Sequence, residues 1–71
     1  MNEIIKNGRI KKGYTQEQIA RILDVPLRTY QYIEYEQHEP KVLLALRVCK
    51  LLEVDPFEAY LPEHQNNDSN K

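Results

Sequence analysis

Residues 15–34 constrain the fold most, because they form two short amphipathic segments joined by a tight turn. Thr15, with Gln18 three residues later, is a capping-box pattern that predicts the start of a helix. Asp24 is the expected turn residue, since Asp tolerates the left-handed conformation better than most residues. Pro26 suits the first turn of a second helix, where a missing N–H costs little. The apolar residues of the first segment recur at helical spacing and share one face: Ile19, Ala20 and Leu23.

The second segment has two chemically different faces. Tyr30 and Ile33 are predicted to lie inward, and the small side chain of Ala20 lets the two helices approach closely. The opposite face is free to touch another molecule and carries Leu27, Arg28, Gln31 and Tyr32. Two helices in this arrangement are typical of the helix-turn-helix, which places its second helix in the major groove of DNA.

The composition indicates one small all-α domain. A chain of 71 residues with 41% hydrophobic side chains suffices for a compact helical bundle. The single cysteine excludes a disulfide within the chain, which suits a reducing cytoplasm. No apolar run approaches the length of a membrane span, and the first residues lack the apolar core of a signal peptide. We therefore expect a cytoplasmic protein that does not associate with membranes.

The charge is divided unevenly along the chain, although the net charge is only −1. Residues 1–33 carry six basic and three acidic side chains, a net charge of +3. Residues 34–71 carry four basic and eight acidic side chains, a net charge of −4. Attraction of phosphate depends on the local field rather than on the total charge, so the first half is the expected DNA-binding half. The alternative is that this division is an accident of a solvated surface.

Cap and turn signals divide the domain, residues 1–61, into five predicted helices. We place these helices at 2–12, 15–23, 26–35, 41–52 and 56–61. Asn2 caps the first helix, Gly13 ends it, and Asp55 caps the last. The fourth helix is expected to bury one stripe: Val42, Ala45, Leu46, Cys49 and Leu52. The polar residues 62–71 have nothing to bury and are expected to be disordered.

Several residues together carry a resemblance that extends over residues 3–61. They are Arg9, Gly-Tyr-Thr-Gln at 13–16, Ile19-Ala20, Val25, Ile33-Glu34, Pro40, the apolar stripe of the fourth helix and Glu-Val-Asp at 53–55. With this spacing the chain resembles the phage repressor and Cro-like helix-turn-helix family, of the xenobiotic-response-element type. The resemblance implies a dimeric transcription regulator that binds a short DNA operator of two half-sites. The chain departs from the family pattern at Asp24, Pro26, Tyr35 and Glu36.

The resemblance implies a structural role for Arg9 and Glu34. In the family an Arg of the first helix pairs with the Glu that closes the third helix. A guanidinium fork meets a carboxylate bidentately, so such a pair would lock the two helices together. The alternative is that Arg9 contacts DNA directly.

The expected DNA contacts fall into two groups. Base readout is assigned to the outer face of the 26–35 helix, at Leu27, Arg28, Gln31 and Tyr32. Arg28 is the first choice, because Arg pairs bidentately with guanine O6 and N7. The alternatives are that Arg28 binds phosphate and that Tyr32 packs on a neighbouring side chain. Phosphate binding is assigned chiefly to Gln16 at the start of its helix, where backbone N–H groups also point outward, with lesser candidates at Thr15, Thr29, Tyr35 and Lys41. The resemblance implies that the third helix supports this Gln.

The last predicted helix offers a candidate dimer contact at Phe57, Tyr60 and Leu61. In Cro-like members this region makes the two-fold contact, which sets the recognition helices about 34 Å apart. The alternative is that Phe57 and Leu61 close the core of the monomer.

No residue pattern indicates catalysis, a metal or a cofactor. His38 and His64 are isolated in polar segments and lack a cysteine at metal-ligand spacing. Cys49 is expected to be a buried, inert thiol. We therefore predict a non-enzymatic, sequence-specific regulator that represses by occluding a promoter and has no small-molecule ligand. A protein-interaction module, such as an antitoxin or an adaptor, is the alternative that the acidic second half favours.

Overall fold

The computed structural model describes residues 1–61 and shows, within that range, five helices and no strand. The helices are α1 (Glu3–Lys12), α2 (Gln16–Leu23), α3 (Leu27–Tyr35), α4 (Val42–Leu52) and α5 (Pro56–Tyr60). This confirms the predicted all-α fold and the order of its elements. The predicted disordered tail, residues 62–71, lies outside the described residues.

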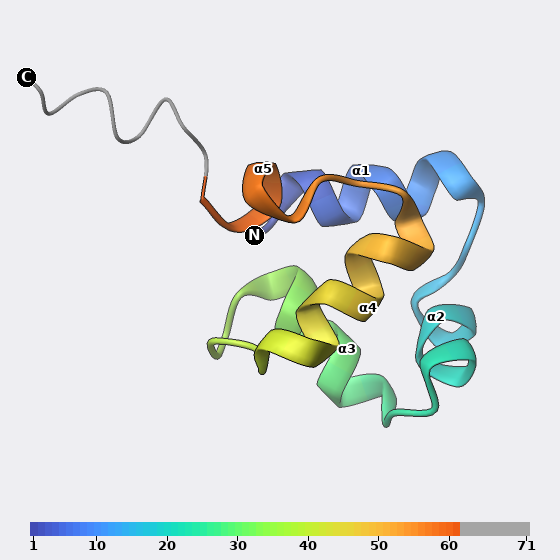
Figure 1. Ribbon diagram of the computed structural model, residues 1–71. Coiled ribbons are helices and arrows are strands. Elements are labelled where there is room, and N and C mark those ends of the chain that lie inside the picture. The colour runs from blue at the N-terminus through green and yellow to red at the C-terminus, as the bar shows by residue number, and fades with distance from the viewer. Residues whose placement is uncertain (62–71) are drawn as a thin grey trace, which may run out of the picture.

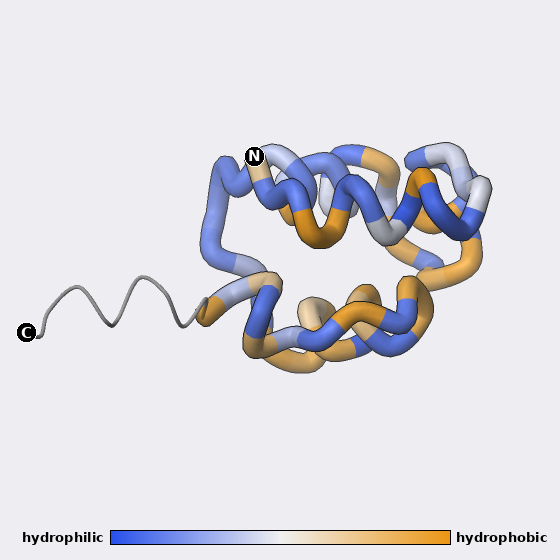
Figure 2. The backbone as a smooth tube through the Cα atoms, turned by 90° about the horizontal axis from the view of Figure 1, so that it is seen from above, coloured by the Kyte–Doolittle hydropathy of each residue, from blue (hydrophilic) through white to orange (hydrophobic). Residues whose placement is uncertain are grey.

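The helices form a small bundle in which α2 and α3 pack against each other, while α1 contacts α3, α4 and α5. Figure 1 shows α1 and α5 at one end of the molecule and the α2–α3 pair at the other, with α4 running between them. Figure 2 shows that the layer from which the grey trace leaves, the one holding α4 and α5, is mainly hydrophobic. The opposite layer alternates more between polar and apolar residues, as expected of amphipathic helices with one solvated face.

The core is built from the apolar faces of all five helices. Its buried members are Ile5, Ile19, Ala20, Leu23, Tyr30, Ile33, Val48, Cys49, Leu52 and Ala59. The inward positions predicted for α2 and α3 are therefore confirmed, including the small residue at their contact. Cys49 is a free, buried thiol, and burial raises its pKa with a further contribution from Asp55.

The predicted stripe of α4 is wrong at two positions. Val42 and Leu46 are 75% and 46% exposed, whereas Val48, which the prediction left out, is fully buried. The buried face consists of Ala45, Val48, Cys49 and Leu52, at the helical spacing i, i+3, i+4 and i+7. Leu46 follows Ala45 directly and is rotated away from this face. Val42 shares the face but lies in the first turn, beyond the edge of the core.

The boundaries of α2 follow local capping chemistry. The Thr15 hydroxyl accepts from the Gln18 backbone N–H at 3.0 Å, and the Gln18 side chain accepts from Thr15 N–H at 2.8 Å. This completes the predicted capping box. Asp24 ends α2 in the left-handed conformation, with φ of 60°, also as predicted. Pro26 is the N-cap residue of α3, so that helix begins at Leu27, one residue later than expected.

Asn2 connects three parts of the fold. Its side chain accepts from the Ile5 backbone N–H at 3.1 Å, which is the predicted cap of α1. Its amide also donates to the Ala59 carbonyl in α5 at 3.0 Å, and its backbone N–H donates to the Glu34 carbonyl in α3 at 2.8 Å. Asn2 is only 3% exposed, so these bonds satisfy a polar side chain inside the fold. The cap was predicted from the sequence, whereas the other two links depend on how α1 packs against α3 and α5.

Candidate nucleic-acid interface

A buried carboxylate, Glu34, organises the contact of α3 with α1 and α2. Arg9 Nε donates to Glu34 Oε2 at 2.6 Å, and Arg9 also donates to the Tyr14 carbonyl at 3.0 Å. The Tyr30 hydroxyl donates to the same carboxylate oxygen at 2.7 Å, and Gln16 Nε2 donates to Glu34 Oε1 at 2.9 Å. Arg9 Nη2 also donates to Glu34 Oε1 at 3.5 Å, so three side chains donate to a carboxylate side chain that is 1% exposed. We call Arg9, Gln16, Tyr30 and Glu34 the Glu34 cluster.

The electrostatics of the Glu34 cluster follow from these contacts. Burial by itself raises the pKa of Glu34, but hydrogen bonds from Arg9, Tyr30 and Gln16 outweigh it and lower that pKa below its ordinary value. The same ion pair raises the pKa of Arg9. Burial, followed by the hydrogen bond to Glu34 and then the charge of Glu34, raises the pKa of Tyr30 well above its usual range. Arg9 and Glu34 are thus ionised and paired, which fixes α3 rather than leaving Arg9 free for a ligand.

Gln16 is held by three side chains of α3. Besides its bond to Glu34, its Nε2 donates to the Tyr35 hydroxyl at 3.2 Å. Gln31 Nε2 in turn donates to Gln16 Oε1 at 3.1 Å. Since a primary amide has two N–H donors, both donors of Gln16 are already engaged. The Tyr35 hydroxyl accepts one of these bonds and keeps its own proton for another acceptor.

The outer face of α3 presents most of the residues expected to touch DNA. Arg28 is exposed, while Thr29, Gln31 and Tyr32 are partly exposed. Leu27 is partly buried and packs against the core cluster, so it is the least free of the expected base-reading residues. Thr15, Tyr35 and Lys41 are exposed, and Thr15 uses its hydroxyl as the cap acceptor of α2.

Tyr32 has an aromatic neighbour. The rings of Tyr32 and His38 meet edge to face, with centroids 4.4 Å apart and an interplanar angle of 90°. The packing of Tyr32 on a neighbouring side chain, raised above as an alternative to DNA contact, therefore occurs. Because Tyr32 remains partly exposed, this packing orients the ring without hiding it.

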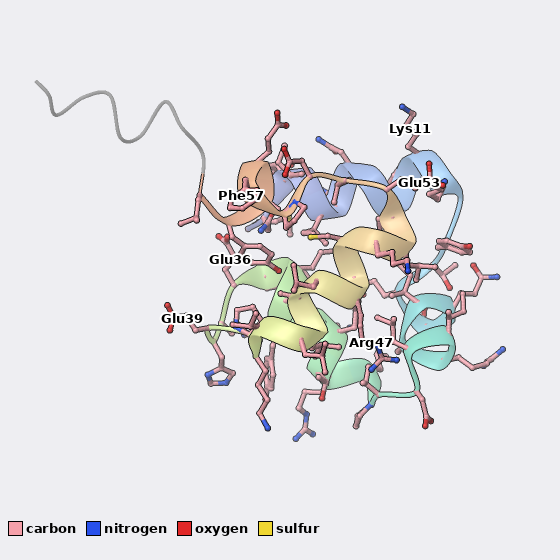
Figure 3. All side chains as sticks on the ribbon, viewed as in Figure 1. Lys11, Glu36, Glu39, Arg47, Glu53 and Phe57 are labelled. Carbon is pink, nitrogen blue, oxygen red and sulfur yellow. The ribbon has the colours of Figure 1, made fainter. Side chains whose placement is uncertain are left out.

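Glu36 follows α3 and turns toward the N-terminus and α5. Its carboxylate lies 3.4 Å from the amino nitrogen of Met1, and its charge contributes to the raised pKa of Tyr60. In Figure 3 the labelled Glu36 lies on the same side of the molecule as Phe57. This acidic residue is therefore drawn away from the start of α3, where Arg28 lies.

The side chains of α5 and the residue after it divide between surface and core. Phe57 and Leu61 are 68% and 63% exposed, so the alternative in which they close the core of the monomer is wrong. Tyr60 is half-buried and packs against the core. Its hydroxyl is buried without a hydrogen-bond partner among the residues that the structure describes, and burial chiefly raises the pKa of Tyr60 to about 12.

The turn at Asp24 joins α2 to α3, and the Glu34 cluster holds the two helices together. The outward face of α3 is polar. Two helices arranged in this way form a helix-turn-helix, a class of DNA-binding motif. Residues 5–58 match the family model described as helix-turn-helix, and the chain belongs to that family. The family is one of DNA-binding domains and not of enzymes.

Two curated proteins of Bacillus subtilis (strain 168) are similar to this chain. One, named as the uncharacterized HTH-type transcriptional regulator YgzD, is 30% identical over 66 residues, which cover 93% of this chain and all of the relative. The other, named as the uncharacterized HTH-type transcriptional regulator YqaF, is 29% identical over 55 residues, which cover 78% of this chain and 72% of the relative. No solved structure gives a significant match.

Two further observations concern a metal site and a membrane-spanning helix. Across residues 1–61, no group of three or more His, Cys, Asp or Glu side chains comes together as metal ligands would. In the same part of the chain, no helix combines the length and apolar character needed to cross a bilayer.

Sequence reasoning missed Tyr30 as a member of the Glu34 cluster and His38 as a neighbour of Tyr32. Tyr30 is four residues before Glu34 on one helix, and this spacing brings side chains together. That signal was present in the sequence. His38 offered no such signal, because it follows the end of α3 and its position depends on how the chain turns there.

Proposed function

We propose that this protein is a transcriptional regulator that binds a DNA operator through α3 in the major groove. The observation that carries the proposal is the Glu34 cluster, which fixes α3 on α1 and α2 while its outer face stays open. A recognition helix must be held rigidly to read bases, and a buried, hydrogen-bonded ion pair provides such a hold. Both Bacillus subtilis relatives are named as HTH-type transcriptional regulators, which supports the same assignment.

Arg28 is the residue to which we assign the main base contact. It is exposed in the first turn of α3, the part of a recognition helix that meets base edges. Its guanidinium suits guanine O6 and N7. Leu27 is assigned a thymine methyl contact, limited by its packing on the core. Gln31 and Tyr32 are assigned to bases farther along the helix.

Phosphate contacts are assigned to the start of α2 and to the side chains around it. Because Gln16 uses both amide donors within the fold, its contribution is the backbone N–H of the first turn of α2. The Tyr35 hydroxyl, which accepts from Gln16, is the side-chain donor in its place. Thr15, Thr29 and Lys41 complete the proposed phosphate contacts.

We assign the exposed apolar side chains at the C-terminal end of the domain to a two-fold contact between copies. Phe57 and Leu61 supply the exposed apolar surface, and Tyr60 lies beside them. A symmetric dimer would read two half-sites about one helical turn apart. Bound at a promoter in the bacterial cytoplasm, such a dimer would repress by excluding polymerase. Sedimentation equilibrium that shows only monomer, both alone and with operator DNA, contradicts this part.

Selection of bound duplexes from a random pool at moderate salt tests the proposed function. The expected result is an inverted repeat with half-site centres about 10 base pairs apart. Binding to the recovered duplex should weaken with salt by a logarithmic slope of about −0.9 for each phosphate neutralised. Failure to enrich any sequence contradicts the proposal.

One observation favours a second candidate, a module that binds another protein. Val42 and Leu43 at the start of α4 are 75% and 71% exposed, which leaves an apolar surface outside the core. An antitoxin or an adaptor would use such a surface. Binding through it would respond little to salt, which distinguishes it from DNA binding in the same titration.

A further inference from the structure

We propose that His38 is a positioning residue for DNA recognition, which acts by holding the ring of Tyr32 on the outer face of α3. The inference rests on the proposed function and names a contact within it. His38 lies in the connection between α3 and α4, outside the helix that carries the base-reading residues.

The end of α3 explains how His38 reaches Tyr32. Glu36 adopts the left-handed conformation with φ of 59°, and its N–H donates to the Tyr32 carbonyl. Gln37 N–H donates to the same carbonyl at 3.2 Å. Both bonds turn the chain back over the last turn of α3, as helix C-caps do. Tyr32 supplies the carbonyl that accepts both bonds. His38 is the next residue after Gln37, so its ring comes to lie against the side chain of Tyr32.

The contact has the geometry that aromatic rings prefer. A ring has a negative face and a positive edge, so a perpendicular arrangement is attractive and specific in orientation. The 90° angle and the centroid distance of 4.4 Å place Tyr32 and His38 in this arrangement. An exposed tyrosine on a helix otherwise exchanges among rotamers in solution. The edge contact restricts Tyr32 before DNA arrives and so reduces the entropy lost on binding.

Tyr32 is the residue through which this restriction would act on DNA. It lies one turn after Arg28, on the outward face, and remains partly exposed beside His38. When its ring is held in one orientation, Tyr32 can present its hydroxyl or its ring edge to the same base pair in every binding event. The expected loss on removing the imidazole is about twofold to tenfold in affinity for the selected duplex, the range that an aromatic pair supports.

A double-mutant cycle between Tyr32 and His38 tests the proposal. Affinity for the selected duplex and for a random duplex is measured for wild type, His38→Ala, Tyr32→Ala and the double variant. We expect His38→Ala to weaken binding to the selected duplex but not to the random one. In the Tyr32→Ala background the same change should have no effect, because a positioning residue acts only through its partner.

Two more variants separate positioning from other roles. His38→Phe keeps an aromatic ring and should restore most of the affinity. Gln37→Ala, in the same connection, should change nothing. If His38→Ala weakened binding to both duplexes equally and His38→Phe did not restore it, the imidazole itself would bind phosphate and the proposal would be wrong. Additive effects of His38→Ala and Tyr32→Ala would also overturn the proposal. If wild type selects no duplex, both the proposed function and this inference fail; if it does and the cycle is additive, only the inference fails.

Discussion

Arg9 Nε and Glu34 Oε2 lie 2.6 Å apart although 25 residues separate them in the chain. The pair joins the last turns of α1 and α3, and the Glu34 carboxylate is 1% exposed. Loss of one partner leaves a buried charge without compensation, which costs much more than loss of a surface pair. The position of α3, and with it the proposed DNA-binding face, therefore depends on this contact.

Replacing Arg9 by Met is expected to lower the free energy of unfolding by about 3 kcal/mol, since the Glu34 carboxylate would remain buried and lose its cation. Urea unfolding monitored by circular dichroism measures the change. Lys12→Met is the control, because Lys12 pairs with the exposed Glu53 at 2.7 Å and should lose less than about 1 kcal/mol. Equal losses in the two variants would contradict a special role for Arg9.

Acid should weaken the fold through Glu34. Its pKa is lowered in the folded protein from an ordinary value of 4.5, so the unfolded chain binds the proton more readily. The stabilisation is therefore complete above about pH 4.5 and is lost as the pH falls through the lower folded pKa. Unfolding free energies measured from pH 6 to pH 3 should fall less steeply in Glu34→Gln than in wild type. Glu53→Gln should flatten the slope less than Glu34→Gln, because Lys12 lowers the pKa of Glu53 only across a solvent-exposed pair.

Glycine at position 8 is required by close packing rather than by backbone conformation. A Cβ on Gly8 would lie 2.7 Å from Val54 Cγ1, in the connection between α4 and α5. Although Ala favours helix by about 1 kcal/mol over Gly, Gly8→Ala should destabilise the domain by about 1–3 kcal/mol. Shortening the neighbour as well, in Gly8→Ala with Val54→Ala, should recover part of that loss in thermal unfolding. An increase in stability from Gly8→Ala alone would contradict the contact.

Two tyrosines with buried hydroxyls should respond in opposite directions to removal of the hydroxyl. The Tyr60 hydroxyl is buried without a partner, so Tyr60→Phe is expected to stabilise the domain by about 1 kcal/mol. The Tyr30 hydroxyl donates to a charged carboxylate, so Tyr30→Phe should cost about 1.5–3 kcal/mol. Calorimetric unfolding of both variants measures the contrast. Destabilisation by Tyr60→Phe would show that its hydroxyl has a partner.

Much of the fold was predictable because its boundaries depend on local chemistry. The capping box at Thr15, the left-handed turn at Asp24 and the cap at Asp55 each need only neighbouring residues. The buried face of α4 was predicted less well, since the exposure of Val42 and Leu46 depends on where the neighbouring helices end. Sequence periodicity gives the direction of a face but not its extent.

The candidate site was predictable in its residues but less so in their contacts. Arg28 could be placed on the outer face of α3 from helical spacing alone. The engagement of Gln16 by Gln31, Glu34 and Tyr35 depends on how α2 crosses α3. The resemblance implies that α3 supports Gln16, and the hydrogen bonds identify the three side chains that do so; the role of Gln16 at phosphate stays a proposal. A hydrogen-bond partner 15 to 19 residues away is fixed by packing, not by sequence spacing.

The most direct test of the account compares Arg28→Ala with Lys11→Ala in binding to the selected duplex and to random DNA. Each change removes one positive charge, but Lys11 lies at the α1 end of the molecule, away from the α2–α3 pair (Figure 3). Arg28→Ala should weaken binding to the selected duplex by about tenfold or more, the range of a bidentate base contact, and relax selection at one base pair. Lys11→Ala should leave both affinities nearly unchanged. Equal losses for Arg28→Ala on the selected and the random duplex would contradict base reading by α3.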